Sequence, residues 1–473
     1  MTLVLDSRRQ IDLEAFRRVA WAGEPAEIAK EALGRIGERR ASLLELVESM
    51  PGARIYGTTT GPDESVKQVL SAEEQRDYES HLTWPPGTFG DPLPERVVRG
   101  IVLARLANFI EGHAGVRPEI AQAVVDALDG RPLPSVPSRG NTWEVPAHAH
   151  LFGELARMGL ELKEPMAFVN GAPAAAALVA DVTLAGRSRL QLAELGLALA
   201  AEAILAPLEH FAPDLEELWG DEHETAALRT MRHLLEDGAE ERRPYQAPVS
   251  FRILPRILGR VGRAQALAEE VAERSLQAVT DNPVYMGPDE QRPLGAVFSN
   301  GGFYNSAGIE AIDGLSFAWA ELCQLVYLQS QRLVEDEPAF DGGRVPVRVL
   351  ASAQAAWADD ARAAAQPTFL PVVGTSQTDG GTLAFSAWRK SGNVGRCLEA
   401  MLANLAVIAS DSLALAARRP PPALEPFLEL VRAKRSPEGS WDSLGRDVGE
   451  LAEVFAGAVY SPEGCNLFRP GYG

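Results

Sequence analysis

Apolar residues recur at helical spacing over long stretches of this chain, and that pattern restricts the fold more than any other feature. The spacing continues through residues 306–335, which predicts a helix well beyond the usual length in globular proteins. Residues 350–365 and 394–417 repeat the pattern and are rich in Ala and Leu. Long helices of this kind are typical of helix bundles, so we predict a mainly α fold.

Short candidates for β-strands are few, and each is also compatible with irregular structure. They are the segments Ala167–Val169, Val179–Leu184 and Ser250–Ile253. Pro and Gly are dense in the N-terminal third, for example in residues 84–94 and 131–139. We therefore expect this third to be rich in loops, which is where a rigid helical scaffold usually places its chemistry.

The chain is acidic, with 45 Lys and Arg residues against 65 Asp and Glu residues and a formal net charge of −20. This balance argues against nucleic acid or an anionic membrane as a partner. The most apolar stretch, residues 190–211, contains Glu194, Glu202 and Glu209. We interpret it as a buried bundle helix and not as a membrane span, because a span tolerates few charges.

Three cysteines without a CxxC pair fit neither a disulfide framework nor a zinc site. The start of the sequence shows no secretory signal pattern, so we expect a cytoplasmic protein without a metal centre. The sequence also lacks a Walker loop, GxGxxG, HExxH and GxSxG. Nucleotide-binding, zinc-protease and hydrolase functions therefore have no support from motifs.

Several polar side chains are candidates for catalysis, each with a plainer alternative. Tyr56 lies in the hydroxyl-rich segment 55–61 and is either a general acid or base or a packed tyrosine in a turn. Arg252 lies in an apolar stretch and needs an anion, either a structural carboxylate or a substrate carboxylate. Asn170 and Asn300 belong to turn-like segments, where their amides either orient a ligand or only shape loops.

Taken in order, these segments resemble the aromatic amino acid lyase family, which includes histidine and phenylalanine ammonia-lyases and the related aminomutases. The resemblance covers residues 55–379, and its most specific parts are IYGTTTG at 55–61 and GHAGVRPE at 112–119. The other matching segments are Ser80-His81, the remainder of 91–119, PLPSVPSRG (132–140), LKEPMAFVNG (162–171), SFRILPRILG (250–259), TDNP (280–283), SNGGFYN (299–305) and GTSQTD (374–379).

The resemblance implies an ammonia-lyase-like fold with a central bundle of long, near-parallel helices. It also implies a homotetramer whose active sites draw on three subunits. We divide the chain into a loop-rich helical domain, residues 1–185, which carries the Tyr56 loop, and residues 186–473, which contain the central bundle and the C-terminal helices. Tyr56, Arg252 and Tyr304 are then expected to meet across subunits.

Position-wise matching implies roles for individual residues. Tyr56 corresponds to the family's catalytic-loop tyrosine. Asn170 and Arg252 match contacts to the substrate carboxylate and the prosthetic group, and His81 and Gln377 match residues that line the pocket. Asn300, in the segment before the longest helix, joins them as a residue expected to orient polar groups of the substrate.

Other positions depart from the family pattern. Val249 replaces the second family tyrosine, and Thr378 replaces the Glu of the family's Gln-Glu-Asp run. Gly302 and Tyr304 replace the Asn and His of the family's GGNFHG segment. We include Tyr304 among the catalytic candidates because its hydroxyl is in the place of the family histidine.

The largest departure concerns the prosthetic group. Family lyases contain an Ala-Ser-Gly that cyclises into a methylidene-imidazolone electrophile (MIO). Here Ser138-Arg139-Gly140 runs into Asn141-Thr142-Trp143-Glu144-Val145-Pro146. Ring formation needs a small residue, a Ser to dehydrate and a Gly whose N–H attacks, so we predict that this chain makes no MIO and uses no other cofactor. Glu144 is either an additional acid or base or an exposed loop carboxylate.

Losing the electrophile removes a transition-state interaction, so ammonia elimination from an ordinary amino acid should become very slow. We therefore predict an MIO-independent lyase-type enzyme of bacterial specialised metabolism. It would catalyse β-elimination, or the reverse conjugate addition or cyclisation, on a small activated substrate. Tyr56 would act as acid or base, and Arg252 would hold a carboxylate or stabilise an enolate. The alternative is a non-catalytic binding or scaffold protein on a lyase fold.

Overall fold

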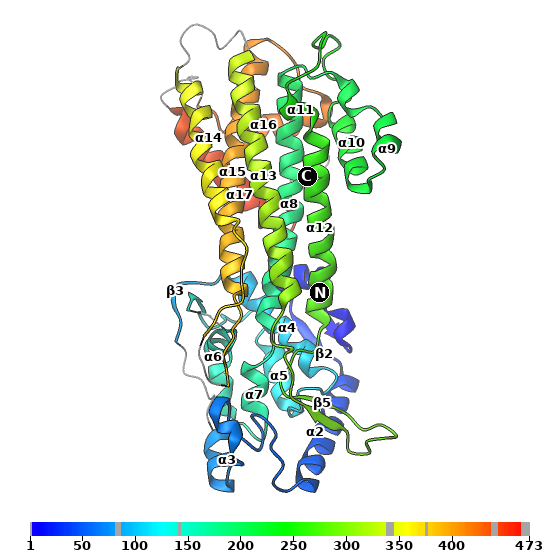
Figure 1. Ribbon diagram of the computed structural model, residues 1–473, viewed down its shortest axis with the longest axis vertical. Helices are drawn as coiled ribbons and strands as arrows, with labels where there is room; N and C mark the ends of the chain where they lie inside the picture. The colour runs from blue at the N-terminus through cyan, green and yellow to red at the C-terminus, as the bar shows by residue number, and fades with distance from the viewer. Residues whose placement is uncertain are drawn as a thin grey trace. The chain divides into compact units, whose positions relative to one another are not determined.

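The computed structural model describes residues 2–80, 87–140, 143–336, 345–373, 377–436 and 443–464. Helices dominate these residues, and the few strands are short (Figure 1). The chain divides into two compact units. The first consists of Met1–Asp181, Ala268–Ala311 and Thr368–Trp388, and the second of Val182–Leu267, Ile312–Pro367 and Arg389–Gly473.

The first unit is built from short helices and small sheets around one central helix. Every residue of α4 from 97 to 109 is buried, as expected for a helix that is surrounded by the rest of its domain. The helices of this unit are α1 Leu13–Phe16, α2 Lys30–Ser49, α3 Ala72–Glu79, α4 Glu95–Phe109, α5 Pro118–Asp126, α6 Val145–Phe152 and α7 Glu164–Val169.

Three strand pairs are described in the first unit, all short. Strands β1 (Leu3–Leu5) and β2 (Ala26–Ile28) pair in parallel. The antiparallel pairs are β3 (Phe89–Pro92) with β4 (Pro137–Arg139), and β5 (Val284–Met286) with β6 (Ala296–Phe298). Strands β4 and β6 each end shortly before a segment that carries candidate site residues, 143–145 and 299–304.

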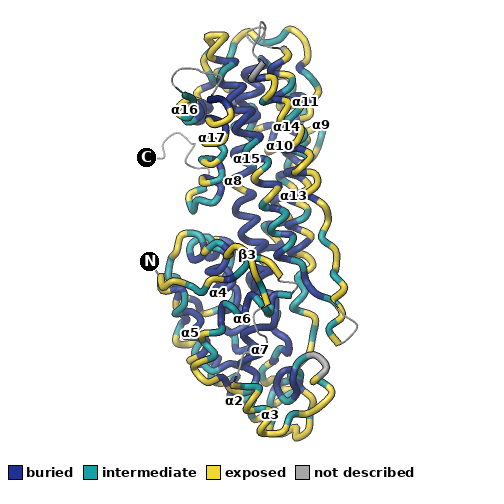
Figure 2. Tube along the Cα trace, turned by 90° about the vertical axis from the view of Figure 1, so that its left-hand side faces the viewer, coloured by how far each residue is buried: buried dark blue, intermediate teal, exposed yellow. Residues whose placement is uncertain are grey.

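The second unit contains most of the long helices. Figure 2 shows α8 and α15 largely in the buried colour. Helices α8 (Pro173–Ala203), α12 (Leu254–Gln277), α13 (Ser306–Asp336) and α15 (Ala384–Leu415) each contribute residues to both units. The other helices of the second unit are α9 Asp214–Trp219, α10 Glu222–Leu234, α11 Val249–Arg252, α14 Val345–Ala364, α16 Glu425–Ala433 and α17 Leu444–Val459.

Buried polar side chains connect the long helices of the second unit. Gln265 of α12 donates to the carbonyl of Thr183 on α8, at 3.0 Å. Gln354 of α14 donates to the hydroxyl of Ser330 on α13, at 2.9 Å, and both are fully buried. Because a buried polar group without a partner is costly, such contacts fix the register of the helices as well as their packing.

The prediction of a mainly α fold is confirmed, and so are the long helices. The stretch 306–335 coincides with α13, whose first turn is capped by Asn305, because its Oδ1 accepts the Gly308 N–H at 2.9 Å. Residues 350–365 and 394–417 overlap α14 and α15.

The strand candidates were wrong. Ala167–Val169 lies in α7, Val179–Leu184 lies in α8, and Ser250–Ile253 overlaps α11. Each is a short run of apolar residues, which periodicity alone does not separate from a piece of a buried helix. Complete burial, as in α7, removes the polar face that would have revealed the helical period.

The two units do not follow the single cut predicted after residue 185. The first unit ends close to this point, at Asp181, but it also takes in Ala268–Ala311 and Thr368–Trp388. The reason is that long helices run from one unit into the other and return the chain to the first unit twice. A division by sequence position cannot represent this connectivity.

Two helical segments of the described chain are long and apolar enough to cross a membrane by length and composition. They are Glu164–Ala203 and Ala384–Leu415, and 94% and 78% of their most apolar windows are buried inside the protein. Core helices of a bundle pass the same test, because they also avoid charge over many residues.

Candidate active site

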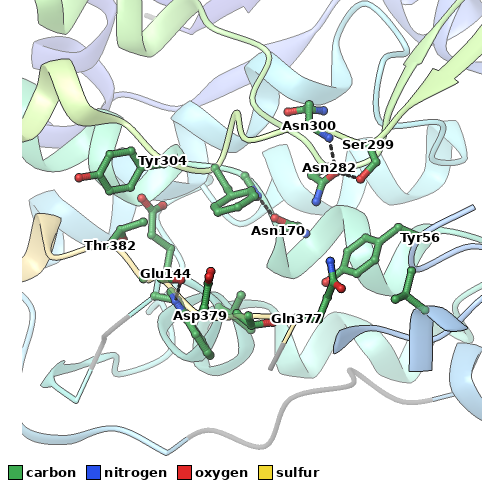
Figure 3. A pocket seen from close by; sticks show the side chains of 18 of the residues that line it. Tyr56, Glu144, Asn170, Asn282, Ser299, Asn300, Tyr304, Gln377, Asp379 and Thr382 are labelled. Atoms are coloured by element: carbon green, nitrogen blue, oxygen red, sulfur yellow. Dashed lines mark hydrogen bonds between the residues drawn. The ribbon is translucent and has the colours of Figure 1, made fainter. Parts of the chain in front are cut away.

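A cavity of about 420 Å³ lies within the first unit (Figure 3). Loops and helix ends from five separate parts of the chain supply its wall. The lining residues are Tyr56, Val66, Trp143, Glu144, Val145, Asn170, Gly171, Asn282, Ser299, Asn300, Phe303, Tyr304, Leu370, Gln377, Thr378, Asp379, Gly380, Gly381 and Thr382. Aromatic and amide side chains dominate, with two carboxyl groups, which is the composition of a small-molecule site.

Tyr56 is held by a tightly hydrogen-bonded loop. The N–H groups of Thr58, Thr59 and Thr60 all point at the carbonyl of Ile55, at 3.0–3.2 Å. The Thr59 hydroxyl donates to Ala53 O at 2.6 Å and accepts the Ile55 N–H at 2.8 Å. The hydroxyl-rich sequence thus replaces regular secondary structure and fixes the backbone beneath Tyr56.

Gly57 allows this loop to pack. Its φ is +56°, in the left-handed region, and a Cβ there would lie 2.6 Å from Cε of Met166. Any side chain at this position would push the loop away from α7. The glycine therefore holds Tyr56 against the element that ends at Asn170.

Amide side chains form the wall between Tyr56 and Glu144 (Figure 3). Asn300 uses its side chain to shape its own loop, since Oδ1 accepts the Gly302 N–H at 2.7 Å and Nδ2 donates to Asp281 O at 3.0 Å. Asn282 Oδ1 accepts the Asn300 N–H at 2.9 Å. These amides position the wall, and the predicted role of Asn300 in orienting a substrate remains a prediction.

A buried ion pair supports this wall from behind. Lys163 Nζ lies 2.5 Å from Asp281 Oδ2, and neither side chain is exposed. Nζ also donates to Ala114 O at 2.8 Å. Burial lowers the pKa of Lys163, and Asp281 opposes that effect. Removing either partner would leave a buried charge without compensation, so the pair rigidly fixes the backbone that leads to Asn282.

Glu144 is buried in the wall opposite Tyr56, with 2% of its surface exposed. Its carboxyl accepts the N–H groups of Ala174 at 2.7 Å and Ala175 at 3.0 Å, in the first turn of α8. Burial nevertheless outweighs these two hydrogen bonds and the attraction of Arg105, and it raises the pKa of Glu144 to about 8. The interpretation of Glu144 as an exposed loop carboxylate was therefore wrong.

Behind Glu144 lies a cluster of buried polar groups. His148, one helical turn further along α6, places Nε2 3.6 Å from Glu144 Oε2. Its Nδ1 lies 2.9 Å from Val169 O and 3.1 Å from Nη2 of Arg105. Arg105 is fully buried and donates from Nη1 to Ala167 O and to Asn170 O. Burial lowers the pKa of Arg105 to about 10, so at neutral pH it remains a cation.

Trp143 connects the loop before Glu144 to the last part of the wall. Its indole N–H donates to Gly380 O at 3.0 Å. Asp379 and Thr382 follow on the same segment and lie on the Glu144 side of the cavity, while Gln377 lies beside Tyr56 (Figure 3). The hydrogen bond of Trp143, in the loop before Glu144, thus holds the segment around Gly380, which is far away in the sequence.

The structure brings most of the predicted site residues together. Tyr56, Glu144, Asn170, Asn300, Tyr304 and Gln377 all line the cavity. Arg252 does not, since it lies on α11 in the second unit, where its Nε donates to Ala247 O at 3.0 Å. His81 lies outside the described residues.

Sequence reasoning missed Arg105 and His148. Two signals pointed to them: Arg105 interrupts an otherwise apolar helical stretch, and His148 follows Glu144 by four residues, which puts both on one face of a helix. A metal centre has no support among the described residues, where no group of three or more His, Cys, Asp or Glu could hold an ion.

Comparison with known proteins decides the family. The family model for aromatic amino acid lyases matches residues 11–144 and 144–433, in two segments that meet at Glu144. The chain belongs to the aromatic amino acid lyase family. Membership of this family suggests an elimination enzyme of the ammonia-lyase type.

Bacterial histidine ammonia-lyases are among the curated relatives of this family member. That of Deinococcus radiodurans is 30% identical over 380 residues, which cover 72% of this chain and 69% of the relative. That of Gloeobacter violaceus is 28% identical over 502 residues and covers 96% of both chains.

Solved structures share the fold over almost the whole chain. Tyrosine aminomutase from Streptomyces globisporus matches with a TM-score of 0.83 and 20% identity, covering 97% of this chain and 98% of that protein. Ergothionase from Treponema denticola, an ergothioneine-degrading enzyme, matches with a TM-score of 0.86 and 18% identity, covering 97% and 99%. The predicted ammonia-lyase-like fold is thereby confirmed.

Proposed function

We propose that this protein is an MIO-independent lyase. It catalyses β-elimination, or the reverse conjugate addition or cyclisation, on a small activated substrate in the cavity between Tyr56 and Glu144. The observation that carries the proposal is the position of Glu144: a buried carboxyl, whose pKa is raised to about 8 by burial, lines the same cavity as Tyr56, the counterpart of the family's catalytic-loop tyrosine. The pair can supply a base and an acid on opposite walls.

The residues present do not fit the family's prosthetic group. The segment before α6 offers Thr142, Trp143 and Glu144 in place of Ala, Ser and Gly, and the family match divides at Glu144. The side chains of Trp143 and Glu144 are both engaged, with Gly380 O and with the first turn of α8. No step of the proposed reaction therefore passes through an electrophile of this kind.

The proposed reaction divides the proton transfers between two residues. Tyr56 removes the proton next to an activating carbonyl, and the C–H electrons form the new double bond as the β-substituent leaves. Glu144, protonated at neutral pH, donates its proton to the atom that gains electron density. This atom is either the leaving heteroatom or the carbonyl oxygen. Positioning plus acid–base catalysis suffices only for a substrate with an acidified proton or a good leaving group.

The role of Arg252, the oligomeric state and the location of the protein are also proposals. Arg252 is absent from the described lining. Because the family resemblance implies active sites that draw on three subunits, we propose that Arg252 reaches the cavity from another subunit. We therefore propose a homotetramer with shared sites in the cytoplasm, acting in bacterial specialised metabolism. Neither nucleic acid nor a membrane is a proposed partner.

A non-catalytic binding protein is the competing function. The changes at Val249, Thr378 and Gly302 favour it, because each removes a family side chain. A closed apolar cavity would have favoured it further. The cavity is lined by Tyr56, Asn170 and Tyr304, which favours catalysis, but the fourth residue expected with them, Arg252, is absent from the described lining, which favours the binding function.

The mass of the intact protein tests MIO independence. Ring formation releases two molecules of water from each chain, so we expect purified protein to have the mass of the unmodified sequence. Loss of two waters would contradict the proposal. The same sample should show no turnover of L-histidine, L-phenylalanine or L-tyrosine.

A panel of activated substrates tests the lyase function. It contains β-substituted ketones and thioesters, and amino acids whose amine is quaternised into a better leaving group. The readout is the absorbance of the conjugated product. For a compound that reacts, Tyr56→Phe and Glu144→Gln should each lower kcat about 10²–10⁴-fold. Unchanged turnover in Tyr56→Phe would remove its assignment, and binding without turnover across the panel would favour the scaffold function.

A further inference from the structure

His148 is the one histidine of the described chain that faces the candidate site from within the core. It has no solvent exposure, and its Nε2 has no hydrogen-bond partner among the described residues. The neighbouring polar atom is Oε2 of Glu144, at 3.6 Å. This gap exceeds a hydrogen bond and is closed by a small rotation of either side chain. An unpartnered, fully buried nitrogen directed at a cavity-lining carboxyl requires an explanation.

The surroundings of Nδ1 decide which ring nitrogen carries the proton. Val169 is the last residue of α7, so its carbonyl lacks a partner within that helix and needs a donor. Nδ1 lies 2.9 Å from this oxygen. The competing neighbour is Arg105 Nη2, at 3.1 Å, while the bonds of Arg105 to Ala167 O and Asn170 O both come from Nη1. The contact between Nδ1 and Val169 O is the shorter of the two. We therefore assign the proton to Nδ1, which leaves Nε2 as an acceptor.

Other groups around His148 keep it neutral. The charged or titratable neighbours are Arg105 from α4 and Glu144, the residue directly before α6. Helix α7 contributes carbonyls, and α8 contributes only backbone N–H groups to Glu144. Asp281 acts through Arg105, and Asp379 lines the same cavity as Glu144. Burial and the cationic Arg105 hold the pKa of His148 well below its usual value.

We infer that His148 is a positioning residue. Its Nε2 accepts a hydrogen bond from the protonated carboxyl of Glu144 and so keeps the proton on Glu144. Since the imidazole cannot take the proton itself beside Arg105, the shared proton stays on the carboxyl. When Glu144 gives its proton to the substrate, its O–H bond breaks and the new carboxylate is stabilised by the Ala174 and Ala175 N–H groups. Protonation from solvent restores the acid.

The role of Glu144 as a proton donor in turnover rests on the proposed function, whereas the hydrogen bond between Glu144 and His148 does not depend on it. The test therefore uses the full-length protein without any substrate. Infrared spectra across a pH titration follow the C=O stretch of a protonated carboxylic acid. We expect a band that is absent from Glu144→Gln and disappears with a midpoint near pH 8. A Glu144 that is ionised at every pH from 5 up would overturn the inference.

Two substitutions of His148 form a matched pair. His148→Asn keeps an N–H near the Nδ1 position but removes the acceptor, and His148→Gln places an amide near Nε2. We expect the midpoint to fall by about one pH unit in His148→Asn and to move less in His148→Gln. Equal midpoints in wild type and His148→Asn would contradict the assignment.

A further measurement uses only the wild-type protein, so its interpretation does not depend on whether a variant folds. Solid-state ¹⁵N NMR of wild-type protein labelled at histidine reports which ring nitrogen is protonated. We expect a neutral His148 ring with Nδ1 protonated at pH 7, and protonated Nε2 would overturn the inference. Absence of turnover would count against the proposed function alone, because these spectra do not depend on a substrate.

Discussion

Both units bury an arginine near a glutamate, but they use the two charges differently. In the bundle, Arg189 of α8 donates to Glu399 of α15 at 2.8 Å and to the Tyr460 hydroxyl at 2.9 Å, and its guanidinium stacks on Trp319. Tyr460 and Glu399 outweigh burial and raise the pKa of Arg189. Burial raises the pKa of Glu399 as well, although the charge and the hydrogen bond of Arg189 oppose that effect.

In the first unit the corresponding charges are kept apart. Arg105 donates from Nη1 to two backbone carbonyls and not to Glu144, and among the described residues Glu144 accepts only backbone N–H groups. A direct cationic partner lowers the pKa of a carboxyl, and Glu144 lacks such a partner whereas Glu399 has one. We therefore interpret the lack of a direct counter-ion as the feature that suits Glu144 to act as an acid. The direct pair with Arg189 makes Glu399 a structural residue.

The largest expected effect concerns the bundle pair. Glu399→Gln leaves Arg189 as a buried cation with reduced compensation, so we expect the free energy of unfolding to fall by about 3–5 kcal/mol. Denaturant unfolding of the intact protein measures this. The matched control is Glu321→Gln on α13, whose pair with Arg260 is partly exposed and should be worth about 1 kcal/mol or less. Equal losses in the two variants would break the comparison.

The pH dependence of stability tests the comparison at Glu144, the carboxyl without a direct cationic partner. Glu144 has a raised pKa in the folded protein, about 8 against an ordinary 4.5, so the folded state binds more protons within that window. Its stabilising contribution is complete below pH 4.5 and is lost as the pH rises toward 8. The wild-type stability minus that of Glu144→Gln should fall by about 1.4 kcal/mol per pH unit. A difference that rises with pH would show an ionised Glu144.

The smallest expected effect concerns the link between the altered loop and the opposite wall. Trp143→Phe removes the indole N–H that binds Gly380 O but keeps an aromatic ring. We expect a loss of about 1 kcal/mol in the free energy of unfolding, with faster hydrogen exchange confined to residues near Gly380. Exchange that accelerates equally in the bundle would indicate a general loss of packing.

The candidate site was predictable only where chemistry depends on residue type in a fixed local pattern. The segment 55–61 identified Tyr56 because its threonines and glycines serve a local loop, and local hydrogen bonds are readable from adjacent residues. Glu144 was misjudged because its burial depends on α8, which begins only after α6 and α7. Exposure of a loop residue is set by what packs over it, and that information is not local.

By itself, the sequence determined the helical character, the family and the absence of an Ala-Ser-Gly tripeptide, because periodicity and motif are properties of neighbouring residues. Only the tertiary structure decided that Glu144 is buried at the start of α8, that His148 and Arg105 lie behind it, and that Arg252 belongs to the other unit. Protonation and reactivity follow from desolvation and from partners distant in sequence, and folding alone brings these together.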